Sequence, residues 1–266
     1  MVVVGLGTAG TNIANKFKKW EQYEVISIDI PKQKSAEGYE NNTPDIKHHF
    51  EDSEEDIWFI VCGSERIAGS TLSILSQIRE RKIKILYIFP DLSFADTMTK
   101  KRNRVVCSVL QEYCRSGLID SIYLVDNRQC EEIFGAGPIL SYFDGINDAI
   151  ASLVHYSNIY ENIKPVFGSS PEYKEVSRIR TFGVYNIEKN QKNMLFLLDN
   201  PTQTCYIYNI TKKELKENNT ILKEIKKVTQ EDCTEENNSS FVIYSTEYDK
   251  NFCHITQSTH FIQEIS

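Results

Sequence analysis

The sequence predicts an α/β fold in which a Rossmann-like parallel sheet is followed by a long central helix and a smaller α+β domain. Three observations lead to this prediction. Apolar runs of strand length alternate with helical patterns through about the first 165 residues, as in a doubly wound sheet. One long helical pattern fits residues 139–163. Beyond Pro165, alternating strand patterns surround one helix rich in lysine and glutamate, which indicates a mixed second domain.

The expected elements follow one another in a regular order. In the first domain the expected strands are 2–4, 24–28, 57–62, 83–89 and 121–125, and the expected helices are 11–20, 69–81, 101–116 and 129–133. Residues 31–56 are polar and acidic and predict a surface loop. In the second domain we expect strands at 180–187, 194–198, 204–210, 240–246 and 252–261, a helix at 212–228 and a short hairpin at 186–203. No low-complexity linker separates the domains, so the long helix is expected to join them.

Composition narrows the class of protein. A chain of 266 residues with 41% hydrophobic residues can bury a full core. The formal charge of −7 and the lack of a dense Lys/Arg stripe argue against a nucleic-acid partner. No apolar stretch exceeds strand length and no signal-peptide pattern opens the chain, so we expect a cytoplasmic protein without direct membrane insertion. Seven scattered cysteines and the adjacent pair His48 and His49 do not have metal-ligand spacing, so no metal site is expected.

The first strand runs directly into a glycine turn. Gly5, Gly7 and Gly10 fit the pattern GxGxxG, and a helical pattern follows. Such a turn lets the backbone approach a pyrophosphate closely while the N–H groups of the helix N-terminus face the anion. Two alternatives stay open. The glycines could serve only the packing of strand on helix, or, with Asp29 about twenty residues further on, they could form the dinucleotide fingerprint of an NAD-dependent oxidoreductase.

The layout resembles the tubulin/FtsZ superfamily over nearly the whole chain. Residues 5–12 resemble the first glycine loop of that family, residues 62–71 lie where it has its GGGTGTG signature, and residues 100–102 match its ribose-side Lys-Lys-Arg. Residues 121–127 resemble the strand that ends in a ribose-binding Asn, and residues 143–148 the start of the central helix. The resemblance implies GTP or GDP as cofactor. It also implies a set of nucleotide-binding residues: Gly5, Gly7, Thr8, Ala9, Gly10, Asn12, Gly63, Ser64, Ala68, Gly69, Ser70, Arg102, Asn127, Phe143 and Asp148.

The base preference that the resemblance implies has a chemical reason. A carboxylate at Asp148 can accept the N1–H and the exocyclic N–H of guanine, which adenine does not offer in that arrangement. Phe143 corresponds to the residue that stacks on the base. Each has a plain alternative, since Phe143 could be a core residue and Asp148 a solvated helix residue.

The signature loop departs from the family pattern. Glu65, Arg66 and Ile67 replace three glycines, and Ala68 replaces the phosphate-binding threonine, which leaves Gly63, Gly69 and the hydroxyls of Ser70 and Thr71. Arg66 could contribute charge-assisted bonds to phosphate, whereas Glu65 would repel phosphate unless it points outward. We therefore expect nucleotide binding to persist while hydrolysis is slow or lost.

The family completes its active site with carboxylates from the next subunit. Glu172 and Glu175 lie at the corresponding loop and are the expected catalytic residues, acting in trans on water beside a phosphate that Mg²⁺ could accompany. The alternative is a polar loop in which Ser170 caps a helix. The resemblance thus implies a head-to-tail homopolymer with weak GTP hydrolysis.

The expected domains are 1–138 for nucleotide binding, 139–164 for the central helix, 165–175 for the trans-acting loop and 176–266 for the C-terminal part. The chain stops at Ser266, directly after the last expected strand, without the tail by which FtsZ recruits membrane tethers. The resemblance therefore favours a phage- or plasmid-type filament protein over a division protein. If it is viral, we expect it in the host cytoplasm. Three readings remain: a polymerising GTPase, a hydrolysis-deficient scaffold on the same fold, and an NAD-dependent oxidoreductase, against which no hydride-transfer site is visible downstream.

Overall fold

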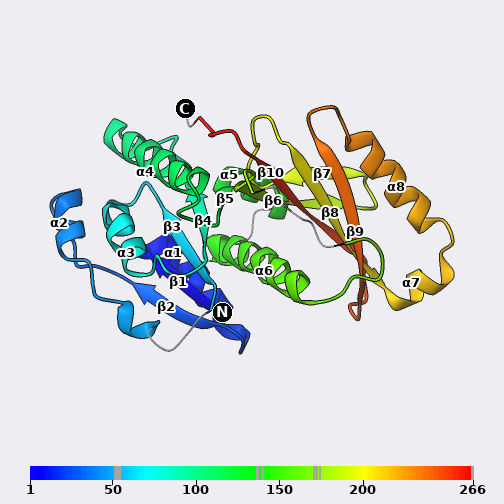
Figure 1. Ribbon diagram of the computed structural model, residues 1–266, viewed down its shortest axis with the longest axis horizontal. Helices are drawn as coiled ribbons and strands as arrows, with labels where there is room; N and C mark the ends of the chain where they lie inside the picture. Colours follow the sequence, from blue (N-terminus) through cyan, green and yellow to red (C-terminus); the bar gives the residue numbers. More distant parts are fainter. Residues whose placement is uncertain (51–54, 136–137, 139–140, 170–172, 174, 265–266) are drawn as a thin grey trace. The chain divides into compact units, whose positions relative to one another are not determined.

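The structure is a computed structural model that describes residues 1–266 apart from 51–54, 136–137, 139–140, 170–172, 174 and 265–266 (Figure 1). The chain forms two compact units, Met1–Ser152 with Ile262–Ser266, and Leu153–Phe261. The division falls inside helix α6, which spans Tyr142–Asn162. Each unit is described by itself.

The first unit is built on a parallel sheet with the order β2-β1-β3-β4-β5 (Figure 1). All four neighbouring pairs in this order are parallel. Three of the strands, including the first, are buried along their whole length, which explains why they read as continuous apolar runs rather than as alternating patterns. The strands are β1 (Val2–Leu6), β2 (Glu24–Ile28), β3 (Ile57–Cys62), β4 (Ile83–Phe89) and β5 (Ser121–Asp126).

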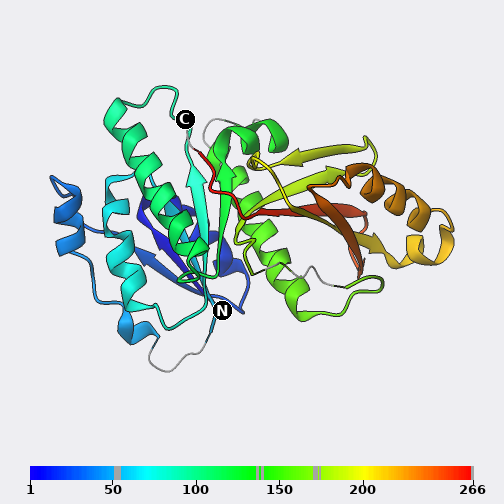
Figure 2. The same cartoon turned by 45° about the horizontal axis from the view of Figure 1, so that its top comes forward.

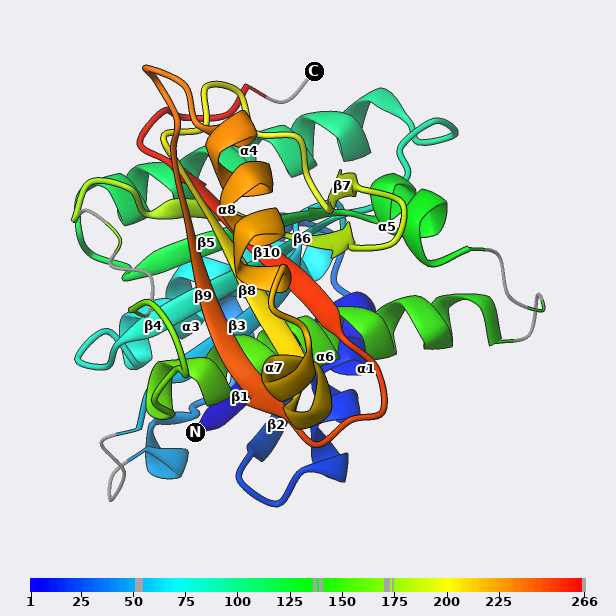
Figure 3. The ribbon, with the colours of Figure 1, turned by 90° about the vertical axis from the view of Figure 1, so that its right-hand side faces the viewer.

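Helices follow the strands as a doubly wound sheet requires. Because β1 leads outward to β2 whereas β3 lies on the other side of β1, right-handed crossovers place α1 and α4 on opposite faces, as Figure 3 shows. The helices are α1 (Gly7–Asn15), α2 (Ala36–Asn41), α3 (Thr71–Gln77), α4 (Thr97–Arg115), α5 (Asn127–Phe134) and α6. Short 3₁₀ helices are η1 (Lys16–Lys19), η2 (Lys47–His49) and η3 (Arg66–Ser70).

The expected loop at 31–56 is wrong over much of its described length. Helix α2 and η2 form there, and Tyr39, Ile46 and Phe50 are buried. The hydroxyl of Ser35 caps α2 by accepting from the N–H of Gly38 at 3.1 Å, and the side chain of Gln77 accepts from the Ile46 N–H at 2.8 Å. Three isolated apolar side chains therefore anchor a segment whose average composition is polar.

Helix boundaries in the first unit also differ from expectation: α4 begins at Thr97 rather than at 101, and α5 spans Asn127–Phe134 rather than 129–133. The helix expected at 11–20 begins earlier, at Gly7, and its last turn is the 3₁₀ helix η1. The helix expected at 69–81 is preceded by η3 and ends at Gln77. Glycines occupy the first turn of α1, so helical propensity alone hides its start.

The second unit contains a sheet with the order β6-β10-β8-β9, and β7 pairs with β6 (Figure 2). Its pairs are antiparallel except for β8 and β9, which are parallel. The strands are β6 (Ile179–Asn186), β7 (Gln191–Met194), β8 (Gln203–Thr211), β9 (Asn238–Thr246) and β10 (Phe252–Thr259). A hairpin forms between β6 and β7 rather than within 186–203, and β7 lies before the strand expected at 194–198 because it pairs with the end of β6 directly across a short turn.

Side chains of β8 alternate between two apolar clusters. Tyr206, Tyr208 and Ile210 pack on the side of α8 (Ile221–Asp232), which lies across the strands in Figure 3. Cys205 and Ile207 face the other way and pack with aromatic residues of α6. This period of two is the pattern of a strand covered on both faces by different partners.

The single helix expected at 212–228 is two helices, α7 (Lys212–Glu217) and α8. Asn218 separates them, because its side-chain oxygen accepts from the N–H groups of Thr220 and Ile221 at 2.9 and 3.1 Å and so starts a new helix. Among the described residues, no helix has both the length and the apolar character needed to cross a membrane.

Candidate functional site

The strand order of the first unit defines where a ligand site is expected. The order reverses between β1 and β3, and ligands of open α/β sheets bind outside the carboxyl ends of the strands at such a switch point. The turn after β1 and the turn after β3 both lie there, and together they carry most of the predicted nucleotide-binding residues. The site is therefore built from two turns on adjacent parallel strands.

The three glycines of the first turn have different tasks. A Cβ on Gly5 would lie 2.5 Å from the carbonyl oxygen of Gly10, and one on Gly10 would lie 2.4 Å from the carbonyl oxygen of Ile60. These two glycines therefore let α1 pack closely on β1 and β3. Gly7 has φ +70°, and its missing Cβ leaves space for the side chain of Glu65.

The N-terminus of α1 already holds an anion, the side chain of Glu65. The N–H of Thr8 donates to Oε2 of Glu65 and the N–H of Ala9 donates to Oε1, each at 3.0 Å. No side chain at the N-cap position of α1 makes this contact, so a residue 57 positions from Thr8 supplies it. Glu65 therefore does not point outward: its carboxylate lies where the oxygens of a phosphate would bind, which is the orientation in which it would repel phosphate.

The environment of Glu65 raises the pKa of its carboxyl group. Burial is the largest cause, and the negative charge of Asp29 acts in the same direction. The hydrogen bonds from Ala9 and Thr8 act in the opposite direction but do not outweigh burial. The carboxylate is therefore held by good geometry in surroundings that disfavour its charge.

The turn after β3 is held by contacts with α4 and β4. Arg102 of α4 donates to the carbonyl oxygen of Ser64 at 2.6 Å, so this predicted ligand residue holds the loop. A Cβ on Gly63 would lie 1.8 Å from the hydroxyl of Tyr87, which donates to Asn103 at 2.8 Å. These contacts fix the backbone that carries Glu65.

The hydroxyl groups expected to reach phosphate do not face the site. Ser70 is fully buried and donates to the carbonyl oxygen of Ile67 at 2.7 Å, which closes the turn of η3. Thr71 is buried as well, and its Oγ1 has no hydrogen-bond partner among the described residues. Ala68 is buried, Gly69 is partly exposed and Arg66 is exposed. Thr8 and Asn12 are exposed and thus open to a ligand.

The predicted base-reading residues lie at the start of α6. Phe143 is 56% exposed, so its interpretation as a core residue is wrong. Asp148 is half-exposed, and its carboxylate accepts from Nζ of Lys19 at 2.7 Å. One turn earlier, Asp144 pairs in the same way with Lys16. An exposed pair of this kind contributes about 0–1 kcal/mol, so Asp148 can exchange Lys19 for a ligand at little cost.

Sequence reasoning missed these two lysines. A usable signal existed, since Lys16 and Lys19 are three residues apart and Asp144 and Asp148 are four apart, both helical spacings. Nothing in the spacing of either pair identifies its partner, because the two segments are separated by 128 residues.

The remaining predicted residues lie on other elements. Asn127 is the first residue of α5 and partly buried, next to Asp126, whose carboxylate caps the helix by accepting from the Arg128 N–H at 2.9 Å. Glu175 is exposed and belongs to the second unit. Glu172 and the proposed cap Ser170 lie outside the described residues.

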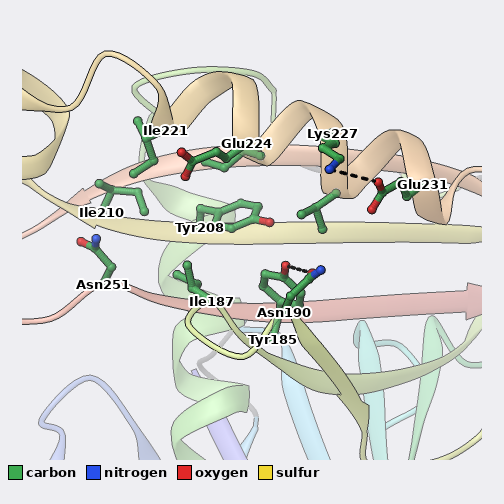
Figure 4. A pocket seen from close by; sticks show the side chains of 12 residues that line it. Tyr185, Ile187, Asn190, Tyr208, Ile210, Ile221, Glu224, Lys227, Glu231 and Asn251 are labelled. Carbon is green, nitrogen blue, oxygen red and sulfur yellow. Dashed lines mark hydrogen bonds and ion pairs between the residues drawn. The ribbon is translucent and has the colours of Figure 1, made fainter.

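The second unit has a cavity that the sequence did not reveal. It measures about 240 Å³ and lies between α8 and the sheet, with Tyr208 on its floor and Glu224 and Lys227 on the helix side (Figure 4). Isoleucines supply much of its lining, and Lys227 pairs with Glu231 at its edge. The hydroxyl of Tyr208 is buried without a partner among the described residues.

No protein-family model and no curated protein matches the sequence. Solved structures do match. CetZ from Methanosaeta thermophila strain DSM 6194 is 14% identical with a TM-score of 0.70, over 98% of this chain and 86% of its own. An FtsZ dimer of M. jannaschii is 12% identical with a TM-score of 0.69, over 97% and 87%. TubZ of Bacillus thuringiensis serovar israelensis, in a GTPγS-form protofilament, is 13% identical with a TM-score of 0.68, over 96% and 85%.

The chain has the tubulin/FtsZ fold. The predicted resemblance and the predicted α/β fold class are thereby confirmed, at 12–14% sequence identity. Within this tubulin/FtsZ fold, the turn after β3 carries Glu65, Arg66, Ile67 and Ala68 in place of the expected glycines and threonine. Among the described residues, no group of three or more His, Cys, Asp or Glu side chains is placed to hold a metal ion.

Proposed function

We propose that this chain binds a guanine nucleotide at the switch point of its parallel sheet and assembles head to tail into filaments in the cytoplasm, with weak GTP hydrolysis completed in trans. The observation that carries the proposal is the carboxylate of Glu65 on the N–H groups of Thr8 and Ala9. That carboxylate stands in for phosphate oxygens, so it supports the view that these two amides form an oxyanion cradle.

The base specificity rests on Asp148. Its carboxylate would accept two donors from guanine after it leaves Lys19, and exposed Phe143 would cover the ring. A bound guanine nucleotide would supply the phosphate that is transferred to water, and this chain's residues would orient it. Among the described residues, no group of three or more His, Cys, Asp or Glu side chains is placed to hold a metal ion, and no step is assigned to Mg²⁺.

Assembly is supported by the solved structures of similar fold. TubZ proteins are described as protofilaments and as two- and four-stranded filaments. A heterologous contact that does not close on itself generates such a polymer. In this proposal Glu172 and Glu175 of one subunit complete the nucleotide site of the next. A phage or plasmid setting fits the likeness to TubZ of type III plasmid segregation.

A second candidate is favoured by the same carboxylate. If Glu65 never leaves α1, the chain is a scaffold that keeps the tubulin/FtsZ fold and the interfaces but does not bind phosphate. An NAD-dependent oxidoreductase has no comparable support, because the glycines at positions 5 and 10 are accounted for by packing and the solved structures of similar fold are FtsZ-like.

Calorimetric titration tests nucleotide binding. We expect GTP and GDP to bind more tightly than ATP or NAD, and Asp148→Ala to weaken GTP binding about tenfold or more, as expected when two buried hydrogen bonds to a charged group are lost. Asp144→Ala is the matched control, because it removes an equivalent ion pair one turn earlier on α6. Equal affinities for GTP and ATP, or equal losses in the two variants, would contradict the guanine assignment.

Light scattering and electron microscopy with GTP test assembly. We expect polymer with the wild type. A Glu172→Ala and Glu175→Ala double variant that assembles but releases no phosphate would make these carboxylates catalytic, whereas loss of assembly would make them interface residues. A wild type that stays monomeric with every nucleotide would exclude the filament proposal.

A further inference from the structure

The carboxylate of Glu65 and a phosphate group need the same two donors. The N–H groups of Thr8 and Ala9 are each 3.0 Å from one oxygen of Glu65, so both are saturated. A second oxyanion on these amides would also meet a like charge at contact distance. Carboxylate and phosphate therefore exclude each other at the start of α1.

We propose that Glu65 is an internal competitor for the phosphate subsite, so that a phosphate-bearing ligand binds to the N-terminus of α1 only when this carboxylate leaves. The inference rests on the proposed nucleotide site and deepens it by naming the residue that controls entry. Glu65 acts as a specificity-determining residue, because it lowers affinity for ligands that use the subsite and leaves ligands without phosphate unaffected.

The backbone holds Glu65 ready for this role. Its own N–H donates to the carbonyl oxygen of Cys62 at 3.3 Å, and its carbonyl oxygen accepts from the N–H of Ala68 at 3.1 Å. Arg102 holds the preceding residue, Ser64, through the carbonyl oxygen. A carboxylate fixed in this way competes at a high effective concentration, since little conformational freedom is lost when it binds.

Gly7 provides the space for the carboxylate itself. A Cβ at this position would lie 2.0 Å from Oε2 of Glu65 and 2.7 Å from Cγ2 of Ile67. The central glycine of the motif thus accommodates a side chain of the same protein in the present arrangement.

The arrangement is also displaceable. Behind the turn, Oγ1 of Thr71 and Nδ2 of Asn103 are buried without partners among the described residues. Each buried polar atom without a partner adds a free-energy cost to the present arrangement of the turn. Burial of Glu65 and the charge of Asp29 likewise disfavour the seated carboxylate.

Titration calorimetry with GTP, GDP and guanosine tests the proposal on the wild type, Glu65→Ala and Glu65→Gln. If the carboxylate occupies the amides about nine-tenths of the time, the apparent affinity for phosphate-bearing ligands is about tenfold weaker than the intrinsic one. We therefore expect Glu65→Ala to bind GTP and GDP at least about tenfold more tightly, and Glu65→Gln to lie between. Guanosine, which has no phosphate, should bind all three equally.

A matched control is Glu80→Ala, which removes the same charge from an exposed carboxylate paired with Arg79. Its GTP affinity should equal that of the wild type. Equal GTP affinity in Glu65→Ala and the wild type would overturn the proposal, as would an equal gain for guanosine and GTP, which would indicate general loosening of the site. Circular dichroism checks that each variant is folded, and Glu65→Gln keeps the shape of the side chain.

A second measurement separates this proposal from the proposed function. Inorganic phosphate is titrated while the amide resonances of Thr8 and Ala9 are followed by NMR. If no variant binds GTP but phosphate shifts these amides in Glu65→Ala more than in the wild type, nucleotide binding fails and the internal competitor stands. Equal responses to phosphate in both proteins would overturn it.

Discussion

A buried histidine in the second unit should make folding stability depend on pH. His254 on β10 is 1% exposed and stacks on Tyr156 and Tyr160 at 6.2 and 5.3 Å. Neither ring nitrogen has a hydrogen-bond partner among the described residues, and burial lowers the pKa of His254 to about 3. Between about pH 3 and 6.5 the folded protein therefore keeps this ring neutral while the unfolded chain protonates it.

The sign and size follow from proton linkage. The unfolded histidine has a pKa of about 6.5, so on acidification the unfolded state takes up a proton that the folded state does not, and stability is lost progressively from about pH 6.5 down to about 3. The factor by which proton binding to this histidine favours the unfolded state rises from about 1.3 at pH 7 to about 33 at pH 5. The free energy of unfolding therefore falls by about 2 kcal/mol over that interval. The folded pKa hardly affects this value as long as it stays below about 4.

Urea unfolding at pH 7, 6 and 5 measures the effect, followed by circular dichroism. His254→Phe retains ring stacking and removes the titration, so the stability difference between it and the wild type should change by about 2 kcal/mol between pH 7 and 5. His260→Gln, at an exposed position, should keep the pH dependence of the wild type. Parallel pH profiles for the wild type and His254→Phe would refute the reasoning, whatever the absolute stability of the variant.

Two further predictions concern packing. Six of the seven cysteines are buried, and burial raises the pKa of Cys205 to about 11 and that of Cys130 to about 12. A thiol reagent should therefore rapidly label one site in the folded protein, the exposed Cys233. Rapid labelling of several cysteines would contradict this packing. Gly10→Ala should destabilise the fold by about 1–3 kcal/mol, because its Cβ would lie 2.4 Å from a backbone oxygen. Gly145→Ala has open space around its Cβ and should be neutral or slightly stabilising. Thermal unfolding of both variants measures the difference.

The parallel sheet could be predicted almost to the residue, and three of its five strands are buried along their whole length. Such strands read as unbroken apolar runs, and three of the five expected ranges have the observed bounds, including 57–62 and 83–89. Segments anchored by single side chains carry no such signal. Helix α2 is one example, and the break at Asn218 between α7 and α8 is another, because one side-chain cap decides it within a continuous helical pattern.

The glycine motif shows why the site was harder to predict than the fold. Gly5 and Gly10 are needed wherever a helix packs this closely on parallel strands, so their pattern is shared by folds that bind NAD and folds that bind GTP. Gly7 permits an anion at the start of α1, but the spacing of the motif cannot identify that anion. Its identity depends on Glu65, which is distant in sequence and reaches α1 only because β1 and β3 are neighbours in the sheet. From the sequence alone, Glu65 looks like the loss of a phosphate-binding loop, but in the folded chain its carboxylate binds the same two amides that a phosphate would use. Measuring competition between Glu65 and phosphate therefore distinguishes a site that has lost phosphate binding from one whose access Glu65 controls.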